Sequence, residues 1–195
     1  MSQEKILFVA AVDAEVKHLP SDAELLITGI GTVNAAMKVS EYLAAARERG
    51  QLPDRVVNLG TVGALRDGLD GVFEISTVIK HDWNLLIESD IHRYLLPEVI
   101  ELETTGQLPR QGLATGDTFV TDTQLRNRLA EESGLCDMEG YAIAAACQHF
   151  GVPLTMLKQV SDPANEETVG QWANALDRAA FELDQAAKKL GFLPH

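Results

Sequence analysis

The sequence predicts an α/β layered fold with a largely parallel central sheet. Short apolar runs of strand length alternate along the chain with longer segments of helical periodicity. The apolar runs are continuous, which is typical of strands buried on both faces. Polar and glycine residues follow several of these runs, at the edge where a parallel sheet gathers its ligand-binding groups.

The first half of the chain predicts four strands and one long helix. The strands are expected at residues 5–11, 24–29, 55–60 and 72–82. Helical character follows the first strand at 13–19. A helix is expected over 32–50, because apolar and small residues recur on one face and Gly50 ends it. The residues of that face are Val33, Ala36, Met37, Ser40, Leu43 and Ala44.

The second half continues the alternation after a segment that is hard to assign. Within 83–110, the run "IHRYLLPEVIEL" fits either a short helix or a loop broken at Pro97. The span 111–120 predicts a strand, a glycine turn and a second strand. Further strands are expected at 135–137 and 154–162, and helices at 121–133, 139–150 and 165–190. The last helix carries an apolar stripe of Leu176, Ala180, Leu183, Ala187 and Leu190.

Length and charge limit the class of protein. The 195 residues fit a single domain over residues 1–195, and a chain of this length builds a core without a disulfide or a metal. The net charge of −13 repels phosphate backbones and anionic membranes. We therefore expect no nucleic-acid partner and no membrane partner.

The two cysteines indicate a reducing compartment. Cys136 and Cys147 lie in apolar surroundings, as buried free thiols do. The apolar run 6–12 is short and acids follow it, so we expect neither a signal peptide nor a membrane span, and a cytoplasmic location. Cys147 and His149 do not share a helix face, so no metal site is expected.

Polar and glycine residues gather at the ends of the predicted strands. Because the carboxyl ends of parallel strands meet at one edge, we expect these groups around one crevice. They are Glu15, Gly29-Ile30-Gly31, Gly60-Thr61-Val62-Gly63, Thr115-Gly116-Asp117, Asp137-Met138-Glu139 and Ser161-Asp162.

Each of these groups also has an ordinary structural interpretation. The glycine segments fit tight turns between a strand and a helix, and they lack the third glycine of a dinucleotide-binding fingerprint. Glu15 fits a solvated helix acid. Glu139 fits an acid in the first helical turn, favoured by the helix dipole. Asp162, which precedes Pro163, fits a turn residue. No single one of them defines a function.

Taken together and in order, six segments resemble the nucleoside phosphorylase/nucleosidase superfamily, most closely its 5′-methylthioadenosine/S-adenosylhomocysteine nucleosidase branch. They are "AAVDAEVKHL", "TGIGTVNAA", "NLGTVGAL", "ATGDTFV", "DMEGYAIAAACQHFGVP" and "LKQVSD". The resemblance implies a three-layer phosphorylase-like fold, in which helices flank a mixed, largely parallel central sheet. It further implies a homodimer, a small-molecule nucleoside substrate and no cofactor.

The resemblance assigns the acid and base roles. Glu15 matches the base that activates the attacking water. Asp162, held by Ser161, matches the acid that protonates purine N7. Glu139 matches the carboxylate that binds the ribose hydroxyls, with Met138 packed against the sugar.

The resemblance implies that the remaining predicted site residues bind the substrate. Thr61 stands where the family usually has Ser, near the water and the ribose. Phe119 matches the aromatic residue that stacks on the purine, and the backbone of Val120 would bond the purine edge. Gly63 and Asp137 complete the substrate-binding set. Trp172 falls where relatives place an aromatic residue over the 5′-substituent, and its alternative interpretation is a helix anchor that packs on the sheet.

The resemblance implies hydrolysis of the N-glycosidic bond of 5′-methylthioadenosine and/or S-adenosylhomocysteine. A carboxyl group at Asp162 donates to N7 and accepts from a 6-amino group, which favours adenine. Phosphorylase relatives bind phosphate with arginines, and neither "AAVDAEV" nor "GTVGAL" contains one before Arg66, which favours water as the nucleophile. The alternatives are hydrolysis of another adenine nucleoside, such as 5′-deoxyadenosine or aminodeoxyfutalosine, a phosphate-dependent phosphorylase, and a non-catalytic nucleoside-binding protein.

The segment 83–110 departs from the family pattern. In relatives this part helps to close the site, partly from a neighbouring subunit. Candidates near it are His81, Asp82, Trp83 and His92, each with a structural role as its alternative. Lys158 stands where many bacterial relatives have Arg. The 5′-substituent of the substrate is therefore left open.

Overall fold

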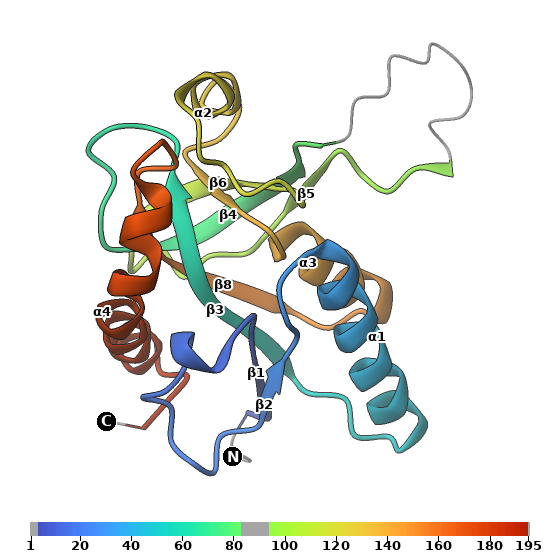
Figure 1. Cartoon of the computed structure of the whole chain (residues 1–195). Coiled ribbons are helices and arrows are strands. Elements are labelled where there is room, and N and C mark those ends of the chain that lie inside the picture. Colours follow the sequence, from blue (N-terminus) through green and yellow to red (C-terminus); the bar gives the residue numbers. More distant parts are fainter. Residues whose placement is uncertain (1–3, 83–93, 195) are drawn as a thin grey trace.

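The computed structural model describes residues 4–82 and 94–194 of the chain (Figure 1). Within these residues the strands are β1 (Ile6–Ala10), β2 (Leu25–Ile27), β3 (Arg55–Ala64), β4 (Val72–Lys80), β5 (Val99–Glu101), β6 (Arg110–Thr115), β7 (Leu135–Asp137) and β8 (Leu154–Asp162). The helices are the 3-10 helix η1 (Asp13–Glu15) and the α-helices α1 (Thr32–Glu48), α2 (Thr123–Leu129), α3 (Gly140–Phe150) and α4 (Thr168–Lys189).

The strands form one mixed sheet in the order β2-β1-β3-β7-β6-β4-β5, and β8 pairs with both β3 and β4. β8 is parallel to β3 and antiparallel to β4. Because β3 also reaches β4 through β7 and β6, these strands close into a ring. Five of the eight pairings in the described residues are parallel, so the predicted mixed, largely parallel sheet is confirmed.

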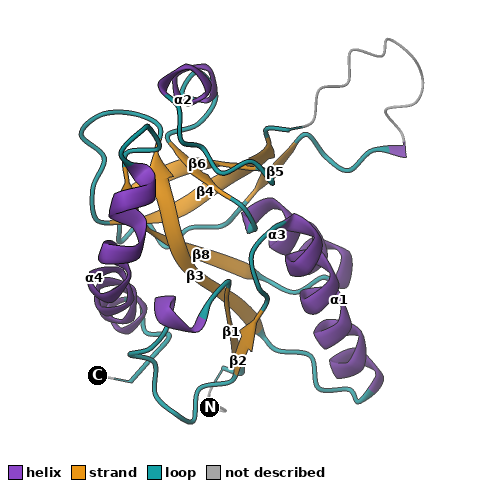
Figure 2. Cartoon of the chain, in the orientation of Figure 1, coloured by secondary structure: helices purple, strands orange, loops and turns teal. Residues whose placement is uncertain are grey.

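Helices cover both faces of the sheet, α1 and α3 on one side and α4 on the other (Figures 1 and 2). Strand β1 supplies side chains to both layers. Leu7 and Val9 enter the core beneath α1 and α3, whereas Phe8 and Ala10 enter the core beneath α4. A strand in the middle of three layers buries both faces, which explains its continuous apolar sequence. The predicted three-layer fold is therefore confirmed.

Most predicted strands are confirmed, but β3 is longer than expected. The sequence predicted a glycine turn at 60–63, and the structure continues β3 through these residues, paired with β8 and shifted in register between Val62 and Gly63. The glycines make room for side chains. A Cβ atom on Gly60 would lie 2.9 Å from Lys158 Nζ, and one on Gly63 would lie 3.1 Å from Asp162 Oδ1.

Three other expectations are corrected. Residues 13–19 contain only the short helix η1. The second strand predicted within 111–120 is absent, since the described chain after β6 runs as a loop up to α2. Strand β5 falls in the segment for which a short helix or a loop was predicted, and it pairs with β4.

Helix α1 is where it was predicted, but its buried face is different. Val33 and Met37 of the predicted face are 66% and 57% exposed. The buried residues are Thr32, Ala35, Val39, Leu43 and Ala46. This face packs against the alanine-rich helix α3, and Leu43 is the one residue of the predicted face that belongs to it. In α4, by contrast, Ala180, Leu183 and Ala187 of the predicted stripe are buried.

Among the residues described, no helix has the length and apolar character that a membrane crossing requires.

We predict that Leu43→Ala lowers the free energy of unfolding by about 2–5 kcal/mol, because it opens a cavity in the core under α1. The matched variant Met37→Ala, on the exposed face of the same helix, should change it by less than about 0.5 kcal/mol. Urea unfolding followed by circular dichroism measures both. Equal losses in the two variants would contradict the observed face of α1.

Candidate active site

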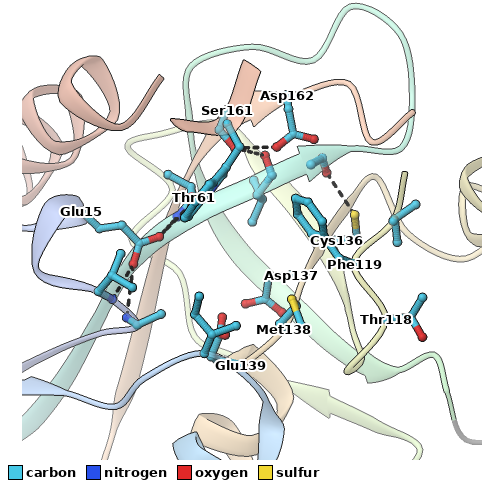
Figure 3. Close-up of a pocket in the computed structure, with 17 residues that line it drawn as sticks. Glu15, Thr61, Thr118, Phe119, Cys136, Asp137, Met138, Glu139, Ser161 and Asp162 are labelled. Carbon is cyan, nitrogen blue, oxygen red and sulfur yellow. Dashed lines mark hydrogen bonds between the residues drawn. The ribbon is translucent and has the colours of Figure 1, made fainter. Parts of the chain in front are cut away.

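A pocket of about 310 Å³ lies at the carboxyl ends of β1, β7 and β8 and along the second half of β3 (Figure 3). It is lined by all eleven residues that the sequence singled out: Glu15, Thr61, Gly63, Phe119, Val120, Asp137, Met138, Glu139, Ser161, Asp162 and Trp172. Ala11, Val12, Ile30, Val62, Thr118 and Cys136 complete the lining. The strands and the loops that follow them, with α4 supplying Trp172, therefore bring these residues into one place.

Glu15 is held at the end of η1 by four hydrogen bonds. Its Oε1 atom accepts from the backbone N–H and from the hydroxyl of Thr61, both at 2.8 Å. Its Oε2 atom accepts from the backbone N–H groups of Ala11 at 3.2 Å and Val12 at 3.3 Å. Glu15 is only 4% exposed. It is thus a fixed, buried carboxylate, and the solvated helix acid of the alternative interpretation is excluded.

Asp162 is held at the end of β8, across the pocket from Glu15 (Figure 3). Its Oδ1 atom accepts from the backbone N–H of Ala164 at 3.0 Å and from the hydroxyl of Thr168 at 2.9 Å. Its Oδ2 atom lies 2.7 Å from the hydroxyl of Ser161. The loop into α4 is therefore built around this carboxyl group, which is more than an ordinary turn residue.

Glu139 occupies a third side of the pocket (Figure 3) and is 8% exposed. It stands at the N-terminal cap of α3, but its side chain makes no capping bond there. Its Oε1 atom instead accepts from the backbone N–H of Gly31, at the start of α1, at 2.8 Å. The sequence predicted a helix N-terminus beside this carboxylate. The helix that supplies the donor is α1 and not α3, because Gly31 is the N-terminal cap of α1.

A buried ion pair lies directly behind Glu139. Lys158 of β8 places Nζ 2.9 Å from Asp137 Oδ2, and the two side chains are 2% and 1% exposed. Asp137 also accepts from the hydroxyl of Thr115 at 2.6 Å and from the backbone N–H of Gly140 at 2.9 Å. The ammonium group occupies the space that a side chain at Gly60 would fill. Asp137 therefore supports the floor of the pocket and the start of α3.

Burial and charge shift the pKa values of this cluster. Desolvation, followed by the charge of Asp137, raises the pKa of Glu139 to about 7, against the opposing effects of Lys158 and the Gly31 N–H. Burial alone would lower the pKa of Lys158, but the charges of Asp137, Glu139 and Glu15 raise it overall. Lys158 is therefore a permanent cation among buried carboxyl groups.

The rest of the pocket is largely apolar. Phe119 is 45% exposed, whereas the neighbouring Val120 is buried. Ile30 and Trp172 add further apolar surface to the lining. An apolar slot with a few convergent carboxyl groups is the ordinary form of a small-molecule site.

The loop before α1 is fixed by a second acid. Asp117 accepts from the backbone N–H of Thr32 at 2.7 Å and also from the hydroxyl of Thr32. Gly29 and Gly31 have φ values of 80° and 100°, so they make the tight turn that the sequence predicted. Asp117 and this turn hold the Gly31 N–H in place for Glu139.

Several supporting residues carry no role in the sequence-based prediction. Lys158, Thr168 and Asp117 are among them. A single lysine inside the apolar run "LTMLKQV" is the signal that could have identified Lys158, since a buried ammonium requires a carboxylate partner. Asp117 had no such signal, because its partner Thr32 lies 85 residues away. Thr168 had none either, because its contact with Asp162 depends on how the loop between them folds.

The candidates near residue 83 do not line the pocket in the part of the chain that is described. Asp82 pairs with Lys80 and accepts from the backbone N–H of Asp117. Burial lowers the pKa of His81, whose ring lies against Gly116. Trp83 and His92 lie outside the described residues.

Over residues 4–82 and 94–194, no cluster of three or more His, Cys, Asp or Glu side chains is arranged to hold a metal ion. Burial raises the pKa values of both thiols, that of Cys147 to about 12. The cysteines are free and buried.

A mixed sheet between helices, with buried carboxyl groups at one pocket, defines an α/β protein with a small-molecule site. Comparison of the sequence with protein families gives its family. The family model of the phosphorylase superfamily matches residues 24–190. The chain therefore belongs to that superfamily, as the sequence motifs predicted.

Relatives within the superfamily include nucleosidases. The chain is 30% identical over 182 residues to the 5′-methylthioadenosine/S-adenosylhomocysteine nucleosidase of Bacillus cytotoxicus, covering 80% of this chain and 75% of that one. It is 28% identical to the enzyme of the same name from Bacillus thuringiensis, with the same coverage.

Solved structures share the fold. The Helicobacter pylori enzyme, as a mutant with 5′-methylthioadenosine in the active site, has a TM-score of 0.80 at 19% identity, covering 98% of this chain and 100% of that one. The S. pneumoniae nucleosidase with a transition-state inhibitor has a TM-score of 0.74 at 24% identity, covering 93% and 95%.

We predict that Lys158→Met lowers the free energy of unfolding by about 3–5 kcal/mol, because it leaves Asp137 as an unpaired buried charge. Adding Asp137→Asn removes that charge and should restore a large part of the loss. Urea unfolding measures both variants. A double variant no more stable than Lys158→Met would contradict the pairing.

We also predict a pH dependence for Glu139. Its folded-state pKa of about 7 lies above the ordinary value of 4.5, so the stability that its protonated form contributes is present below pH 4.5 and lost as pH rises through 7. Glu139→Gln stays neutral throughout. Between about pH 4.5 and about pH 8, the free energy of unfolding of the variant, relative to that of the wild type, should therefore rise by on the order of 3 kcal/mol. Urea unfolding at a series of pH values measures it. Parallel pH profiles would refute the shift.

Proposed function

We propose that the protein hydrolyses the N-glycosidic bond of an adenine nucleoside, 5′-methylthioadenosine and/or S-adenosylhomocysteine, and releases adenine and a 5′-substituted ribose. The observation that carries this proposal is the placement of Glu15, Asp162 and Glu139 on separate sides of one pocket (Figure 3). The names of the bacterial relatives at 28–30% identity support the same reaction.

Glu15 is proposed as the general base. Cleavage of the N-glycosidic bond makes the sugar oxocarbenium-like, and a water molecule must attack the carbon that the base leaves. The four bonds to Glu15 fix its carboxylate at the pocket wall, where it takes a proton from that water. The use of two carboxyl groups on opposite sides of the sugar parallels inverting glycosidases.

Asp162 is proposed as the general acid that protonates purine N7. The Ser161 hydroxyl has one proton and lies within reach of two acceptors, the Val62 carbonyl at 3.2 Å and Asp162 Oδ2 at 2.7 Å. When that proton goes to Val62, Asp162 Oδ2 faces a hydroxyl oxygen that only accepts. Oδ2 can then carry the proton that the leaving purine requires.

Glu139 is proposed to bind the ribose hydroxyls. A carboxylate accepts two hydroxyl hydrogen bonds, fixes the sugar and stabilises its developing positive charge. Met138 would pack against the sugar, Phe119 would stack on the purine, and Val120 would bond the purine edge through its backbone. Thr61, Gly63 and Asp137 shape the ribose side of the site.

Water is the proposed nucleophile because the pocket offers phosphate no partner. No Arg, Lys or His belongs to the pocket lining in the described part of the chain. Lys158, the nearest buried cation, is already paired with Asp137. A phosphate dianion would therefore enter among carboxyl groups without a charged donor, which is unfavourable.

The proposal extends to the domain organisation, location, oligomeric state and cofactor use of the protein. We propose a single domain that works in the cytoplasm as a homodimer, without metal or cofactor. Two buried free thiols suit a reducing compartment. The proton transfers require only carboxyl groups, so the reaction needs no added group.

We predict adenine release from 5′-methylthioadenosine or S-adenosylhomocysteine in phosphate-free buffer, with Glu15→Gln and Asp162→Asn each lowering kcat by about 10²–10⁴. Chromatography of adenine measures the rate. The matched control Glu131→Gln alters an exposed acid and should retain the wild-type rate.

The same assay separates the alternatives. A panel should include 5′-deoxyadenosine and aminodeoxyfutalosine, each with and without phosphate. Obligatory phosphate would identify a phosphorylase, and nucleoside binding without adenine release would identify a binding protein. Near-normal turnover in either variant would overturn the assigned mechanism.

A further inference from the structure

Trp172 makes a polar contact inside the pocket. It lies in the second turn of α4 and is half-buried. Its indole Nε1 lies 3.1 Å from the hydroxyl oxygen of Thr61. A ring that only stacked on a 5′-substituent would not need this nitrogen, so the contact calls for its own explanation.

The direction of the hydrogen bonds follows from the chemistry of the groups. An indole N–H only donates, so the Thr61 hydroxyl oxygen accepts from Trp172. The hydroxyl has a single proton, and Glu15 Oε1 lies 2.8 Å away (Figure 3). With its oxygen occupied by the indole, the hydroxyl is directed to donate to Glu15. The three groups thus form a chain from Trp172 through Thr61 to Glu15.

We propose that Trp172 is a positioning residue for the general base. It acts through Thr61, whose hydroxyl proton it directs toward Glu15. This inference rests on the proposed hydrolysis, because it assigns Glu15 as the base. Without the indole N–H, the Thr61 hydroxyl rotates and donates elsewhere, and the water itself is an available acceptor. Glu15 then loses one of its four hydrogen-bond donors, and its carboxylate is no longer held in the orientation that faces the attacking water.

Helix α4 also supports the proposed general acid, Asp162. Thr168 lies one helical turn before Trp172 and on the same face, since the two are four residues apart. Its buried hydroxyl donates to Asp162 Oδ1 at 2.9 Å and accepts from the backbone N–H of Asn165 at 2.9 Å. Two successive turns of one helix therefore support the proposed acid and the proposed base.

A further contact joins α4 to the segment that carries Glu15. Lys17 pairs with Asp177 of α4, and His18 stacks edge-on against Phe181, with ring centroids 6.0 Å apart. These contacts keep η1 and α4 in register along the sheet.

The test is a double-mutant cycle between Trp172 and Thr61. Trp172→Phe keeps an aromatic ring and removes the N–H. Thr61→Val keeps the shape and removes the hydroxyl, and Thr61→Ser keeps the hydroxyl. We expect Trp172→Phe to lower kcat about tenfold with little change in KM, the effect of losing one hydrogen bond. In the Thr61→Val background the same change should cost less than about twofold, because the two residues act through one contact. In the Thr61→Ser background the tenfold loss should return.

The choice of substrate separates positioning from stacking. A loss through Glu15 is equal for 5′-methylthioadenosine and 5′-deoxyadenosine, because the base acts on the same water in both. A stacking role would raise KM for the 5′-thio substrate alone. Additive losses in the cycle, or a loss confined to the 5′-thio substrate, would overturn the inference.

A second measurement does not depend on activity. The chain has two tryptophans, Trp83 and Trp172, so its two indole N–H signals in a ¹⁵N-labelled sample are assigned by the signal that Trp172→Phe removes. In Thr61→Val, the Trp172 signal should shift and exchange faster with solvent, and in Thr61→Ser it should not. An indole signal indifferent to Thr61→Val would refute the contact even if no adenine were released. Absence of adenine release with a responsive indole would count against the proposed function alone.

Discussion

Four carboxyl groups buried around one pocket are the constraint on which the rest of this structure depends. Glu15, Asp137, Glu139 and Asp162 are each at most 9% exposed. Carboxyl groups so close repel one another and lose hydration, so each must find donors within the protein. The donors come from the turn after β1, from β3, from the start of α1 and from the loop into α4. The hydrogen bonds that stabilise these buried carboxyl groups therefore also hold the layers of the fold in position.

This arrangement also gives the pocket a sign. One ammonium group, that of Lys158, lies among the four carboxyl groups, and it is bound to Asp137. A negative pocket suits a reaction in which the sugar becomes positive, and it disfavours an anionic nucleophile. The raised pKa of Glu139 follows from the same crowding. Burying these charged groups lowers the stability of the fold at the place where the proposed chemistry needs charge, as is common at functional sites.

Sequence patterns predicted the elements well where one interaction dominates. β8 was predicted at 154–162 because its burial on both faces leaves a continuous apolar run. The sequence patterns were wrong where the role of a residue depends on a neighbour that is distant in sequence. Gly60 indicated a turn, but its missing side chain makes room for Lys158. The face of α1 was misassigned because apolar residues lie on two sides of the helix, and the side with Ala35 and Val39 is the one that packs, whereas Val33 and Met37 are exposed. Most of the site residues could be located together because they follow strand ends, whereas the contacts that Thr168 and Asp117 make behind them could not.

The space at Gly60 ties two positions of the chain to one another. Any side chain at 60 would collide with the ammonium of Lys158, and a shorter residue at 158 would leave Asp137 unpaired. Neither position is free to change first without a cost, so the order in which substitutions arise matters. A lineage that lost the lysine would have to neutralise Asp137 before it could fill the space at 60. A glycine at 60 and a cation at 158 are therefore expected to be inherited together, through epistasis between neighbouring strands.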